Sequence, residues 1–548
     1  MARTPLLGKL QALYRDFAEA DRTGKPVEQV QEERRRAWTR RDFIKAAGAT
    51  VGAAAFSGPI AALAGQAPRI AIIGGGIAGL NAALTLQDAG IASTVYEASD
   101  HVGGRMHSDT TSWLNGQVSE HCGELIDTKH KTIRGLANRF NIPVTDLSAA
   151  EPAQSTETYF FFHKYYTREQ ANIDFNPVYN ACKDGLKAAP FPTLYNSFTA
   201  GGLALDHLNL SDWIDQNVPG GHTSNMGQLL DVAYNIEFGA NTNLQSSLNL
   251  IYLLAFQPVP GNFRIFGTSD ERYHLTGGNQ RLPQAIADSL PVGSVQLNTG
   301  LTAIVLNGDN TYDLTLNGPR GRSFTVVADR VILALPFSVL RAILATTADF
   351  VAAGFDGRKQ TAIQQLGYGK NCKLQLQFDS RLWNTTGPWG LSTGTTYSDT
   401  GYQNTWDVTR GQPGSTGILV DYTGDGVPLA SFTGDPSDRK VVAGFATTFM
   451  NELEPVFPGI NRLWNGRATL DVPLTNPNLL GSYSYWKVGQ YTGFSGYEKA
   501  RQPFPNGKCH FAGEHCSINF QGFMEGGAEE GARAATEILG DYKAGIFP

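Results

Sequence analysis

A glycine-rich turn between two short apolar runs constrains the fold of this chain more than any other feature. Residues 69–73 are typical of a buried parallel strand, and residues 74–79 follow directly as Gly-Gly-Gly-Ile-Ala-Gly. Apolar residues then recur at helical spacing up to Gly90, and a second apolar strand ends in Glu97. A strand, a GxGxxG turn, a helix, a strand and an acid in this order predict a Rossmann-like dinucleotide-binding unit.

Each glycine of the GxGxxG turn has its own physical role. We expect Gly74 to permit the tight turn, Gly76 to let the backbone approach a pyrophosphate, and Gly79 to let helix and strand pack closely. The helix that follows offers free N–H groups and the positive end of its dipole to the phosphates. Glu97, 18 positions beyond Gly79, is predicted to accept hydrogen bonds from the adenosine ribose.

A second glycine-rich element follows the acid. Residues 98–105 read Ala-Ser-Asp-His-Val-Gly-Gly-Arg, in which Gly104 brings backbone close to a cofactor and Arg105 can neutralise phosphate charge. An acid followed by Gly-Gly-Arg resembles the second signature element of the flavin amine oxidase superfamily, and this resemblance implies FAD rather than NAD. If Gly103-Gly104-Arg105 stood alone, the alternative would be an ordinary glycine-rich turn with a solvated Arg105.

The C-terminal region resembles the third signature segment of the same family. Residues 511–515 read Phe-Ala-Gly-Glu-His, and residues 522–528 open an alanine-rich helix that runs to Leu539. The match implies that Glu514 binds the ribityl chain and that the backbone at Met524 donates to the flavin pyrimidine. The positive end of this helix would stabilise the negative charge that a flavin gains on reduction.

The resemblance covers most of residues 68–540, including a strand predicted over residues 329–336. Because positions 74 and 514 must meet around one cofactor, the cofactor domain is predicted to be discontinuous. The expected fold class is α/β, with a discontinuous Rossmann-like FAD-binding domain and an α+β substrate-binding domain. The FAD-binding domain is assigned residues 68–145, 269–344 and 488–542, and the substrate-binding domain residues 146–268 and 345–487.

Periodicity predicts further elements between these motifs. Residues 295–328 alternate and should form antiparallel hairpins with a turn at residues 307–310. Residues 211–238 and 248–256 are predicted to be partly helical. Residues 384–426, rich in Gly, Thr and Asp, are expected to form strands joined by long loops.

Lys373 is the candidate residue for oxygen chemistry. It lies in an alternating strand at residues 371–378, ten positions before Trp383. In the flavin amine oxidase family a lysine at this spacing from a tryptophan holds a water molecule against flavin N5, so the resemblance implies this role for Lys373. An ordinary solvated lysine is the alternative, and it is our interpretation of the neighbouring Lys370.

Tyr491 and Phe523 are the candidate walls of an aromatic cage. Residues 486–492 resemble the family segment that carries one wall, and Phe523 matches the opposite wall. Two facing rings leave a slot that strips water from an amine and directs its α-hydrogen to flavin N5, whereas the alternative is two ordinary core aromatics. Relatives with covalent flavin carry cysteine before the cage tyrosine; this chain has Gln490, so noncovalent FAD is expected.

The substrate is less constrained than the cofactor. L-amino-acid oxidases of the superfamily grip the substrate carboxylate with an arginine shortly after the Gly-Gly-Arg element, and residues 119–127 contain none. Glu124 and Asp127 would instead attract a cationic amine. Trp486 is a further candidate for substrate contact.

These observations predict an FAD-dependent oxidase that converts a polyamine or a primary amine to an imine or aldehyde and reduces O2 to hydrogen peroxide. An L-amino-acid oxidase, giving a 2-oxo acid, ammonia and hydrogen peroxide, is the second candidate, for which Arg272 and His274 would bind the carboxylate. A structural role for these two residues is at least as consistent with the turn that follows them. An FAD-linked desaturase or isomerase is the third, and Lys373 with the paired aromatics counts against it.

Residues 1–64 are predicted to be an export signal rather than part of the fold. Residues 39–45 read Thr-Arg-Arg-Asp-Phe-Ile-Lys, which matches the twin-arginine pattern, and an uncharged Ala- and Gly-rich stretch ends in Ala-Leu-Ala at residue 64. This stretch is too weakly apolar for a stable membrane anchor. We therefore expect the twin-arginine export machinery as a partner and a periplasmic or extracellular location.

Composition excludes other classes of function. A net charge of -6 argues against electrostatic binding of nucleic acid. The five cysteines are scattered without CxxC spacing, so we expect buried or free thiols, with one disulfide as the alternative, and no metal site. A chain of 548 residues is expected to form two or three intertwined lobes, and the sequence leaves homo-oligomer formation open.

Overall fold

Five short parallel strands, drawn from both ends and the middle of the chain, form one sheet in the order β21-β13-β1-β2-β9. The strands are β1 (Ile70–Ile73), β2 (Thr94–Tyr96), β9 (Val295–Gln296), β13 (Arg330–Leu333) and β21 (Cys509–Phe511). Every residue of β1 is buried, which is why this strand reads as a continuous apolar run rather than an alternating one. The predicted Rossmann-like unit is confirmed, and its strands are discontinuous in sequence.

The structure is a computed structural model that describes residues 68–257, 261–427, 429, 432 and 434–546. The predicted export signal therefore lies outside the described residues. Within the described ranges, no helix combines the length and the apolar character that crossing a membrane requires. The five cysteines all lie in these ranges and are free thiols, four of them buried, as their spacing predicted.

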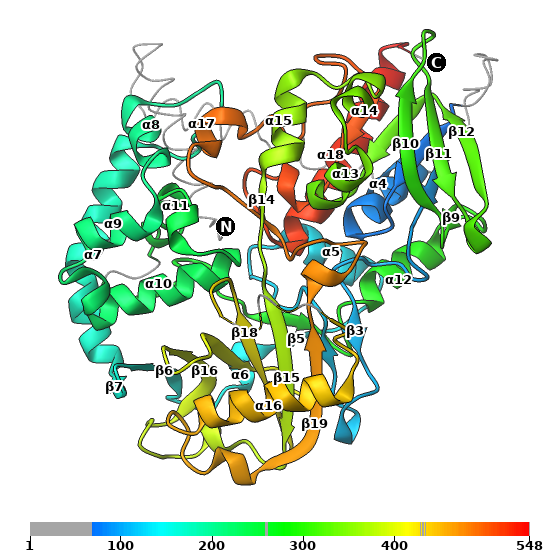
Figure 1. Cartoon of the computed structure of the whole chain (residues 1–548). Helices are drawn as coiled ribbons and strands as arrows, with labels where there is room; N and C mark the ends of the chain where they lie inside the picture. Colours follow the sequence, from blue (N-terminus) through cyan, green and yellow to red (C-terminus); the bar gives the residue numbers. More distant parts are fainter. Residues whose placement is uncertain (1–67, 258–260, 428, 430–431, 433, 547–548) are drawn as a thin grey trace, which may run out of the picture. The chain divides into compact units, whose positions relative to one another are not determined.

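Helices α4 (Ile77–Asp88) and α18 (Met524–Lys543) pack against each other beside the parallel sheet (Figure 1). Glycine makes this close approach possible, because a Cβ atom on Gly531 would lie only 2.0 Å from the carbonyl oxygen of Ala78. Most of α4 is buried, including Leu80 and Leu84. The helix after the GxGxxG turn and the C-terminal helix of the third signature segment thus contact each other directly.

A seven-stranded sheet in the order β19-β15-β18-β17-β16-β6-β7 forms the second large element. Its strands are β6 (Thr156–Phe161), β7 (Lys164–Tyr166), β15 (Cys372–Phe378), β16 (Ser392–Ser398), β17 (Asn404–Asp407), β18 (Gly417–Thr423) and β19 (Trp464–Asp471). All neighbours are antiparallel except β6 and β16. Helix α16 (Arg439–Leu453) crosses one face at β15 and β19 (Figure 1).

Strand β15 alternates as predicted, yet both of its faces are buried. Leu374 and Leu376 point into the hydrophobic cluster that α16 completes. The polar side is covered by residues 114–124, because Lys373 and Gln375 both donate to the carbonyl oxygen of Glu120. The alternation therefore separates two buried environments, one apolar and one polar.

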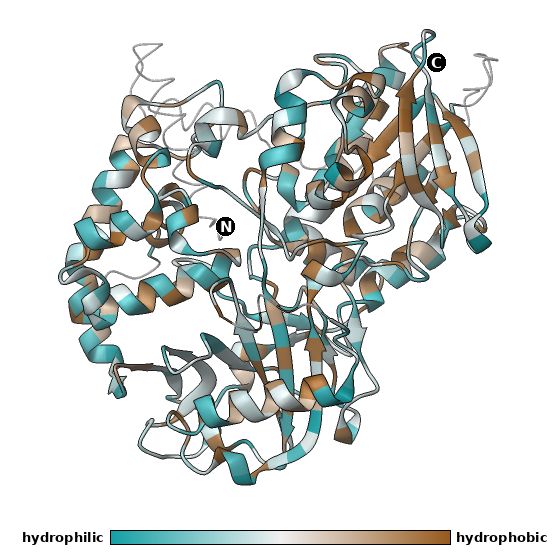
Figure 2. Ribbon diagram, viewed as in Figure 1, coloured by the Kyte–Doolittle hydropathy of each residue, from teal (hydrophilic) through white to brown (hydrophobic). Residues whose placement is uncertain are grey.

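A group of helices adjoins the seven-stranded sheet, and Figure 2 shows hydrophilic and hydrophobic residues alternating along α7 and α10. The group consists of α7 (Arg168–Ala188), α8 (Ala200–Asp206), α9 (Leu210–Asn217), α10 (Asn225–Phe238) and α11 (Leu248–Leu254). The helices predicted within residues 211–238 and 248–256 are confirmed. Ser224 caps α10 through its side chain, and Gly239 ends it in a left-handed conformation.

The predicted hairpins are confirmed in a three-stranded antiparallel sheet that contains β10 (Gly300–Leu306), β11 (Tyr312–Asn317) and β12 (Ser323–Ala328). Only residues 295–296 depart from the expectation, because they join the parallel sheet as β9. The remaining short strands are β3 (Ser108–Asp109), β4 (Ser119–Glu120), β5 (Val144–Asp146), β8 (Tyr273–Leu275), β14 (Gly367–Tyr368) and β20 (Ser484–Tyr485). The remaining helices are α5 (Lys131–Arg139), α6 (Leu147–Ala150), α12 (Arg281–Ser289), α13 (Phe337–Ile343), α14 (Thr347–Ala352), α15 (Gly357–Gln365) and α17 (Gln490–Phe494).

The predicted fold class holds: a parallel, Rossmann-like sheet accompanies a larger mixed sheet with helices. The described residues belong to one compact unit. The division into an FAD-binding and a substrate-binding domain at the stated boundaries stays a prediction.

Candidate active site

A cavity of about 1600 Å³ connects the carboxyl ends of the parallel strands with the seven-stranded sheet. At one end it is lined by the turn after β1 and by Ala334–Pro336 after β13, and at the other by side chains of β15 to β18. The carboxyl edge of a parallel sheet is where open α/β folds bind their ligands. The cavity thus joins a nucleotide-type binding edge to a wall of polar side chains.

The glycine turn at the parallel-sheet end fits the roles predicted for it. Gly74 has φ +107°, and a Cβ atom there would lie 2.6 Å from the carbonyl oxygen of Ala334. A Cβ atom on Gly79 would lie 2.0 Å from the carbonyl oxygen of Gly74, so helix and turn touch directly. A Cβ atom on Gly76, in contrast, would lie no closer than 3.8 Å to its nearest neighbour in the described residues, the carbonyl oxygen of Gly103, and Gly76 lines the cavity. A side chain at Gly76 would fill the space in which a pyrophosphate would approach the backbone.

Glu97 ends the second parallel strand and lines the same end of the cavity, with 7% of its surface exposed. Its Oε2 accepts a hydrogen bond from the Gly75 N–H at 2.5 Å, and its Oε1 accepts from the N–H and the hydroxyl of Ser99. These contacts fix the carboxylate beside the glycine turn. Its place fits the ribose-binding role that the sequence predicted.

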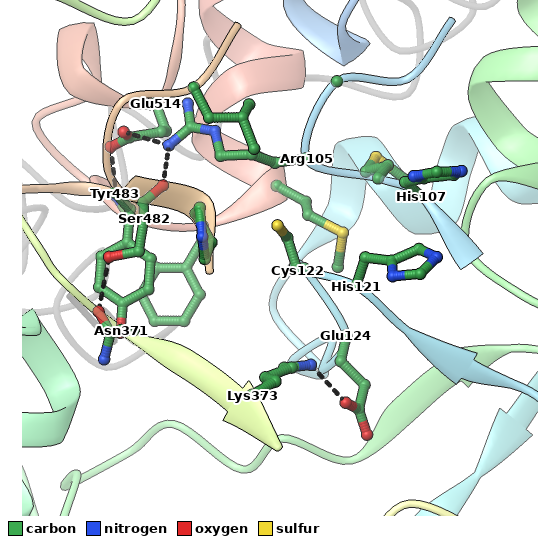
Figure 3. Close-up of a pocket in the computed structure, with 18 of the residues that line it drawn as sticks. Arg105, His107, His121, Cys122, Glu124, Asn371, Lys373, Ser482, Tyr483 and Glu514 are labelled. Atoms are coloured by element: carbon green, nitrogen blue, oxygen red, sulfur yellow. Dashed lines mark hydrogen bonds and ion pairs between the residues drawn. The ribbon is translucent and has the colours of Figure 1, made fainter. Parts of the chain in front are cut away.

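Arg105 and Glu514 bring the second and third signature motifs together (Figure 3). The Arg105 Nη1 lies 2.9 Å from Glu514 Oε1 and also donates to the carbonyl oxygen of Ser482. Burial raises the pKa of Glu514, but the charge of Arg105 and several hydrogen bonds outweigh this and hold the pKa below its usual value. Gly104, with φ +57°, lines the cavity just before Arg105. In this arrangement Arg105 neutralises a carboxylate of the protein; its predicted contact with phosphate stays a prediction.

The start of α18 provides a further feature that fits a flavin. Met524 is its first residue and lines the cavity, and the first-turn N–H groups of a helix have no partner within that helix. His515, also at the cavity wall, is buried, and neither of its ring nitrogens has a hydrogen-bond partner among the described residues. Burial lowers the pKa of His515 to about 3, so the ring is neutral. Unpaired buried polar atoms of this kind are typical of sites completed by a ligand.

Lys373 lies at the opposite wall and forms a buried ion pair with Glu124 (Figure 3). Its Nζ lies 2.7 Å from Glu124 Oε2, and only 4% of the Lys373 surface is exposed. Trp383, which served to recognise Lys373 in the sequence, is a core residue whose indole donates to Asp407. Lys370 is 42% exposed and pairs with Asp425, in agreement with its interpretation as a solvated lysine.

The predicted aromatic cage requires a correction, because the structure does not bring Tyr491 to the cavity. Tyr491 is 2% exposed, packs against Trp486 with ring centroids 5.0 Å apart, and donates to Asn249 Oδ1. Trp486, predicted to contact substrate, is also absent from the cavity wall. Both rings pack in the core with Phe494, and their segment faces the helices rather than the cavity.

Tyr483 is the tyrosine that lines the cavity beside Phe523. A Cβ atom on Gly522, next to Phe523, would lie 3.5 Å from the Tyr483 ring. The Tyr483 hydroxyl is 3.0 Å from that of Tyr422, and it donates to the carbonyl oxygen of Ile236. The aromatic run at residues 483–486 could have indicated this part of the cavity wall. Which of its rings lines the cavity, however, depends on which side of β20 faces the cavity. The residue before Tyr483 is a serine and not a cysteine, so noncovalent FAD remains the expectation.

The two acids proposed as substrate contacts have different positions. Glu124 lines the cavity but is engaged by Lys373. Asp127 is 1% exposed and does not line the cavity; its Oδ1 accepts from the backbone N–H groups of Asp270 and Glu271. Asp127 therefore orders the turn that carries Glu271 instead of meeting the substrate directly.

The two carboxylate-binding candidates are paired with acids of the protein. Arg272 donates from Nε and Nη2 to Asp146, and the His274 ring nitrogen Nε2 lies 2.8 Å from Glu120 Oε1. This arrangement favours the structural role that the sequence left open for both.

Sequence reasoning missed two acids that line the cavity, Glu237 at the end of α10 and Glu271. No hydrogen bond or ion pair joins either side chain to another residue of the described ranges. Burial raises the pKa of Glu237 to about 7, and burial together with the nearby Glu237 raises that of Glu271 to about 8. Nothing in local spacing signals this pair, because its members come from a helix end and a distant turn.

Comparisons with known proteins identify the family of this chain. The family model for flavin containing amine oxidoreductases matches residues 77–539. Polyamine oxidase 2 of Arabidopsis thaliana is 25% identical over 86% of this chain and 88% of its own. L-amino-acid oxidase of Mus musculus is 24% identical over 87% of this chain and 71% of its own. The structure of cyclohexylamine oxidase from Brevibacterium oxydans IH-35A superposes with a TM-score of 0.70 at 18% identity, covering 87% of this chain and 100% of that one. The chain belongs to the flavin containing amine oxidoreductase family.

Proposed function

We propose that this protein is an FAD-dependent oxidase of primary amines that carry a second positive charge, with diamines and polyamines as the substrate class and O2 as acceptor. The observation that carries the proposal is the pair Glu237 and Glu271 in the cavity. Two carboxyl groups that form no ion pair with a described residue suit a ligand that supplies positive charge. Their raised pKa values mean that a cationic ligand, by stabilising the charged forms, would bind more tightly as they ionise.

Most cationic side chains that line the cavity are paired with acids of the protein. Arg168 pairs with Glu157 at 2.7 Å, and Arg410 pairs with Glu151 at 2.7 Å. With Arg272 held by Asp146 as well, the two acids that form no ion pair with a described residue remain available to a cationic substrate. This balance favours an ammonium group over a carboxylate.

FAD, when bound, would accept the hydride of the amine carbon and pass two electrons to O2. For the substrate the change is R–CH2–NH2 + O2 → R–CH=NH + H2O2, and water then converts the imine to an aldehyde and ammonia. Gly76, Glu97 and the start of α18 would hold the cofactor. Tyr483 and Phe523 would exclude water from the reacting carbon and orient it. Lys373 would hold a water molecule at the opposite wall.

One observation favours the L-amino-acid oxidase as a second candidate. Arg264 lines the cavity, and its guanidinium forms no ion pair with a described residue. It is therefore available to a substrate carboxylate.

A peroxide-coupled screen of the purified holoprotein tests the proposal. We expect turnover with putrescine and spermidine, weaker turnover with monoamines of similar length, and little with the twenty amino acids. Glu237→Gln and Glu271→Gln should raise the KM for putrescine about tenfold or more, with a smaller effect on a monoamine. Glu529→Gln is the matched control, because the pKa of Glu529 is also raised to about 7 by burial, yet this residue does not line the cavity. Efficient turnover of amino acids alone would transfer the assignment to the second candidate.

We also propose that residues 1–64 direct export by the twin-arginine route to a periplasmic or extracellular location, and that FAD is bound noncovalently. Replacing both arginines at positions 40 and 41 with lysine should leave the protein inside the cell. Acid precipitation of the holoprotein should release the yellow cofactor into the supernatant.

A further inference from the structure

We infer that Glu124 is a positioning residue that keeps the Lys373 ammonium charged and directs its remaining hydrogen into the cavity. The inference rests on the proposed function only in so far as Lys373 serves the oxygen half-reaction. It assigns Glu124 a role toward Lys373 rather than toward the substrate.

The geometry leaves one donor of the ammonium for a ligand. An ammonium has three N–H donors; one is directed to Glu124 Oε2 at 2.7 Å and another to the carbonyl oxygen of Glu120 at 3.3 Å. Lys373 also lines the cavity, so the third hydrogen is available to a water molecule there. The Trp406 ring, with its centroid 5.4 Å from the ammonium, adds a cation–π contact on another side.

Glu124 is itself held in place. Its second oxygen, Oε1, accepts a hydrogen bond from the Trp406 indole at 2.8 Å. Burial raises the pKa of Glu124, but the charge and the hydrogen bond of Lys373 outweigh this and hold the pKa below its usual value. The carboxylate is therefore ionised and fixed between Lys373 and Trp406, which makes it a poor partner for an incoming amine.

Burial makes this counter-ion necessary. The side chains of Lys373 and Glu124 are 5% and 6% exposed. A lysine in such a place without a counter-ion loses its proton readily, because desolvation disfavours the charged form. The other titratable groups around Lys373 do not replace Glu124, since Glu120 binds His274 and Asp471 binds His121. Cys122, whose pKa burial raises to about 12, and Tyr422, whose pKa burial also raises, are neutral.

The first test measures the oxygen reaction without any substrate. The holoprotein is photoreduced, mixed with O2 and followed by the return of flavin absorbance over a range of pH. In Glu124→Gln the rate at neutral pH should fall at least about tenfold, as expected for a buried lysine whose pKa drops by several units. The rate should recover as the pH is lowered, and Glu124→Asp should restore part of it at neutral pH.

The matched control is Asp425→Asn, which removes the partner of the neighbouring Lys370 at 3.1 Å and should leave the rate unchanged at every pH. A Glu124→Gln protein that reoxidises like wild type, or one slowed equally at all pH values, overturns the inference. Because photoreduction needs no amine, this outcome is separate from a failure to find a substrate.

The second test uses the holoprotein and the pH dependence of its unfolding. A buried lysine without a counter-ion binds its proton less readily in the folded protein than in the unfolded chain, so the unfolded chain binds more protons and stability rises with pH. We expect the stability of Glu124→Gln relative to Glu124→Gln/Lys373→Met to increase between about pH 6 and about pH 10. A difference that does not change with pH would mean that Lys373 keeps its charge without Glu124, and the inference would fail.

Discussion

The two ends of the cavity recognise their ligands by different means. At the parallel-sheet end the backbone is the recognition surface: Gly74 and Gly79 are packed so closely that no Cβ atom fits, and Gly76 faces the cavity. At the end formed by the seven-stranded sheet, side chains provide the recognition surface. Lys373 forms an ion pair with Glu124 there, and Tyr483 lies beside Phe523. The glycine turn that provides the backbone surface is one contiguous segment, whereas the side chains at the other end come from distant segments.

The sequence separations show this difference. The Gly75 N–H and the Glu97 carboxylate, which meet at the nucleotide end, are 22 residues apart. Lys373 and Glu124 are 249 residues apart. A substitution at the first end should therefore act on cofactor binding as a whole, and one at the second end on a single step of the reaction.

The largest effect is expected for Gly79→Ala. Its Cβ atom would overlap the carbonyl oxygen of Gly74 at 2.0 Å, so the glycine turn must move away from the helix. The purified protein should contain almost no flavin by its visible absorbance. Gly135→Ala in α5 is the control, since a Cβ atom there meets nothing within 4 Å and alanine favours a helix by about 1 kcal/mol. Full flavin content in Gly79→Ala would show that the close contact is not needed.

The next effect is expected for Lys373→Met at the opposite end. The change leaves the Glu124 carboxylate buried without its counter-ion, which should cost about 3–5 kcal/mol of unfolding free energy. Flavin content should stay near wild type, and reoxidation by O2 should slow sharply. Lys370→Met, which removes an exposed lysine from the segment just before β15, should change neither property. Loss of flavin in Lys373→Met would erase the distinction between the two ends.

The contrast between the two ends also explains what the sequence could predict. The parallel strands β1, β2 and β13, the glycine turn and Glu97 were predicted because each is specified by neighbours within a few residues of itself. The hairpins at residues 300–328 and the helices α10 and α11 were predicted from periodicity for the same reason.

The errors and omissions concern contacts between distant segments. Tyr491 and Trp486 were placed at the cavity because their aromatic run matched, but the turn of the chain after β20 sends them into the core and leaves Tyr483 at the cavity. Glu237 and Glu271 were missed because no local pattern joins them. Glu124 was noticed as an acid, yet its pairing with Lys373 depends on how residues 114–124 cross β15.

Tyr483→Leu and Tyr491→Leu form a matched pair that tests the corrected cage. Tyr483→Leu removes a ring from the cavity wall and should raise the KM for amine about tenfold. Tyr491→Leu removes a core ring and its hydrogen bond to Asn249, so it should lower the unfolding free energy by about 1–3 kcal/mol and leave the KM near wild type. Steady-state kinetics and thermal unfolding of both variants give the comparison. The reverse pattern would restore the original assignment.

The smallest effect is expected for pH, and it distinguishes binding from stability. The folded-state pKa of Glu271, about 8, lies above its ordinary value, so the folded protein binds more protons between about pH 4.5 and about pH 8 and loses stability as pH rises. Glu271→Gln removes this loss, and its advantage in melting temperature should grow up to about pH 8 and then level off. The kcat/KM for a diamine should change in the opposite direction, rising through the same range in wild type and much less in Glu271→Gln, because the ionised acid binds the cation. A variant at the exposed Glu169, Glu169→Gln, should show neither trend. If the melting temperature and kcat/KM changed in the same direction with pH, Glu271 would be a structural acid. Selection of substrates by charge at this end of the cavity would then be contradicted.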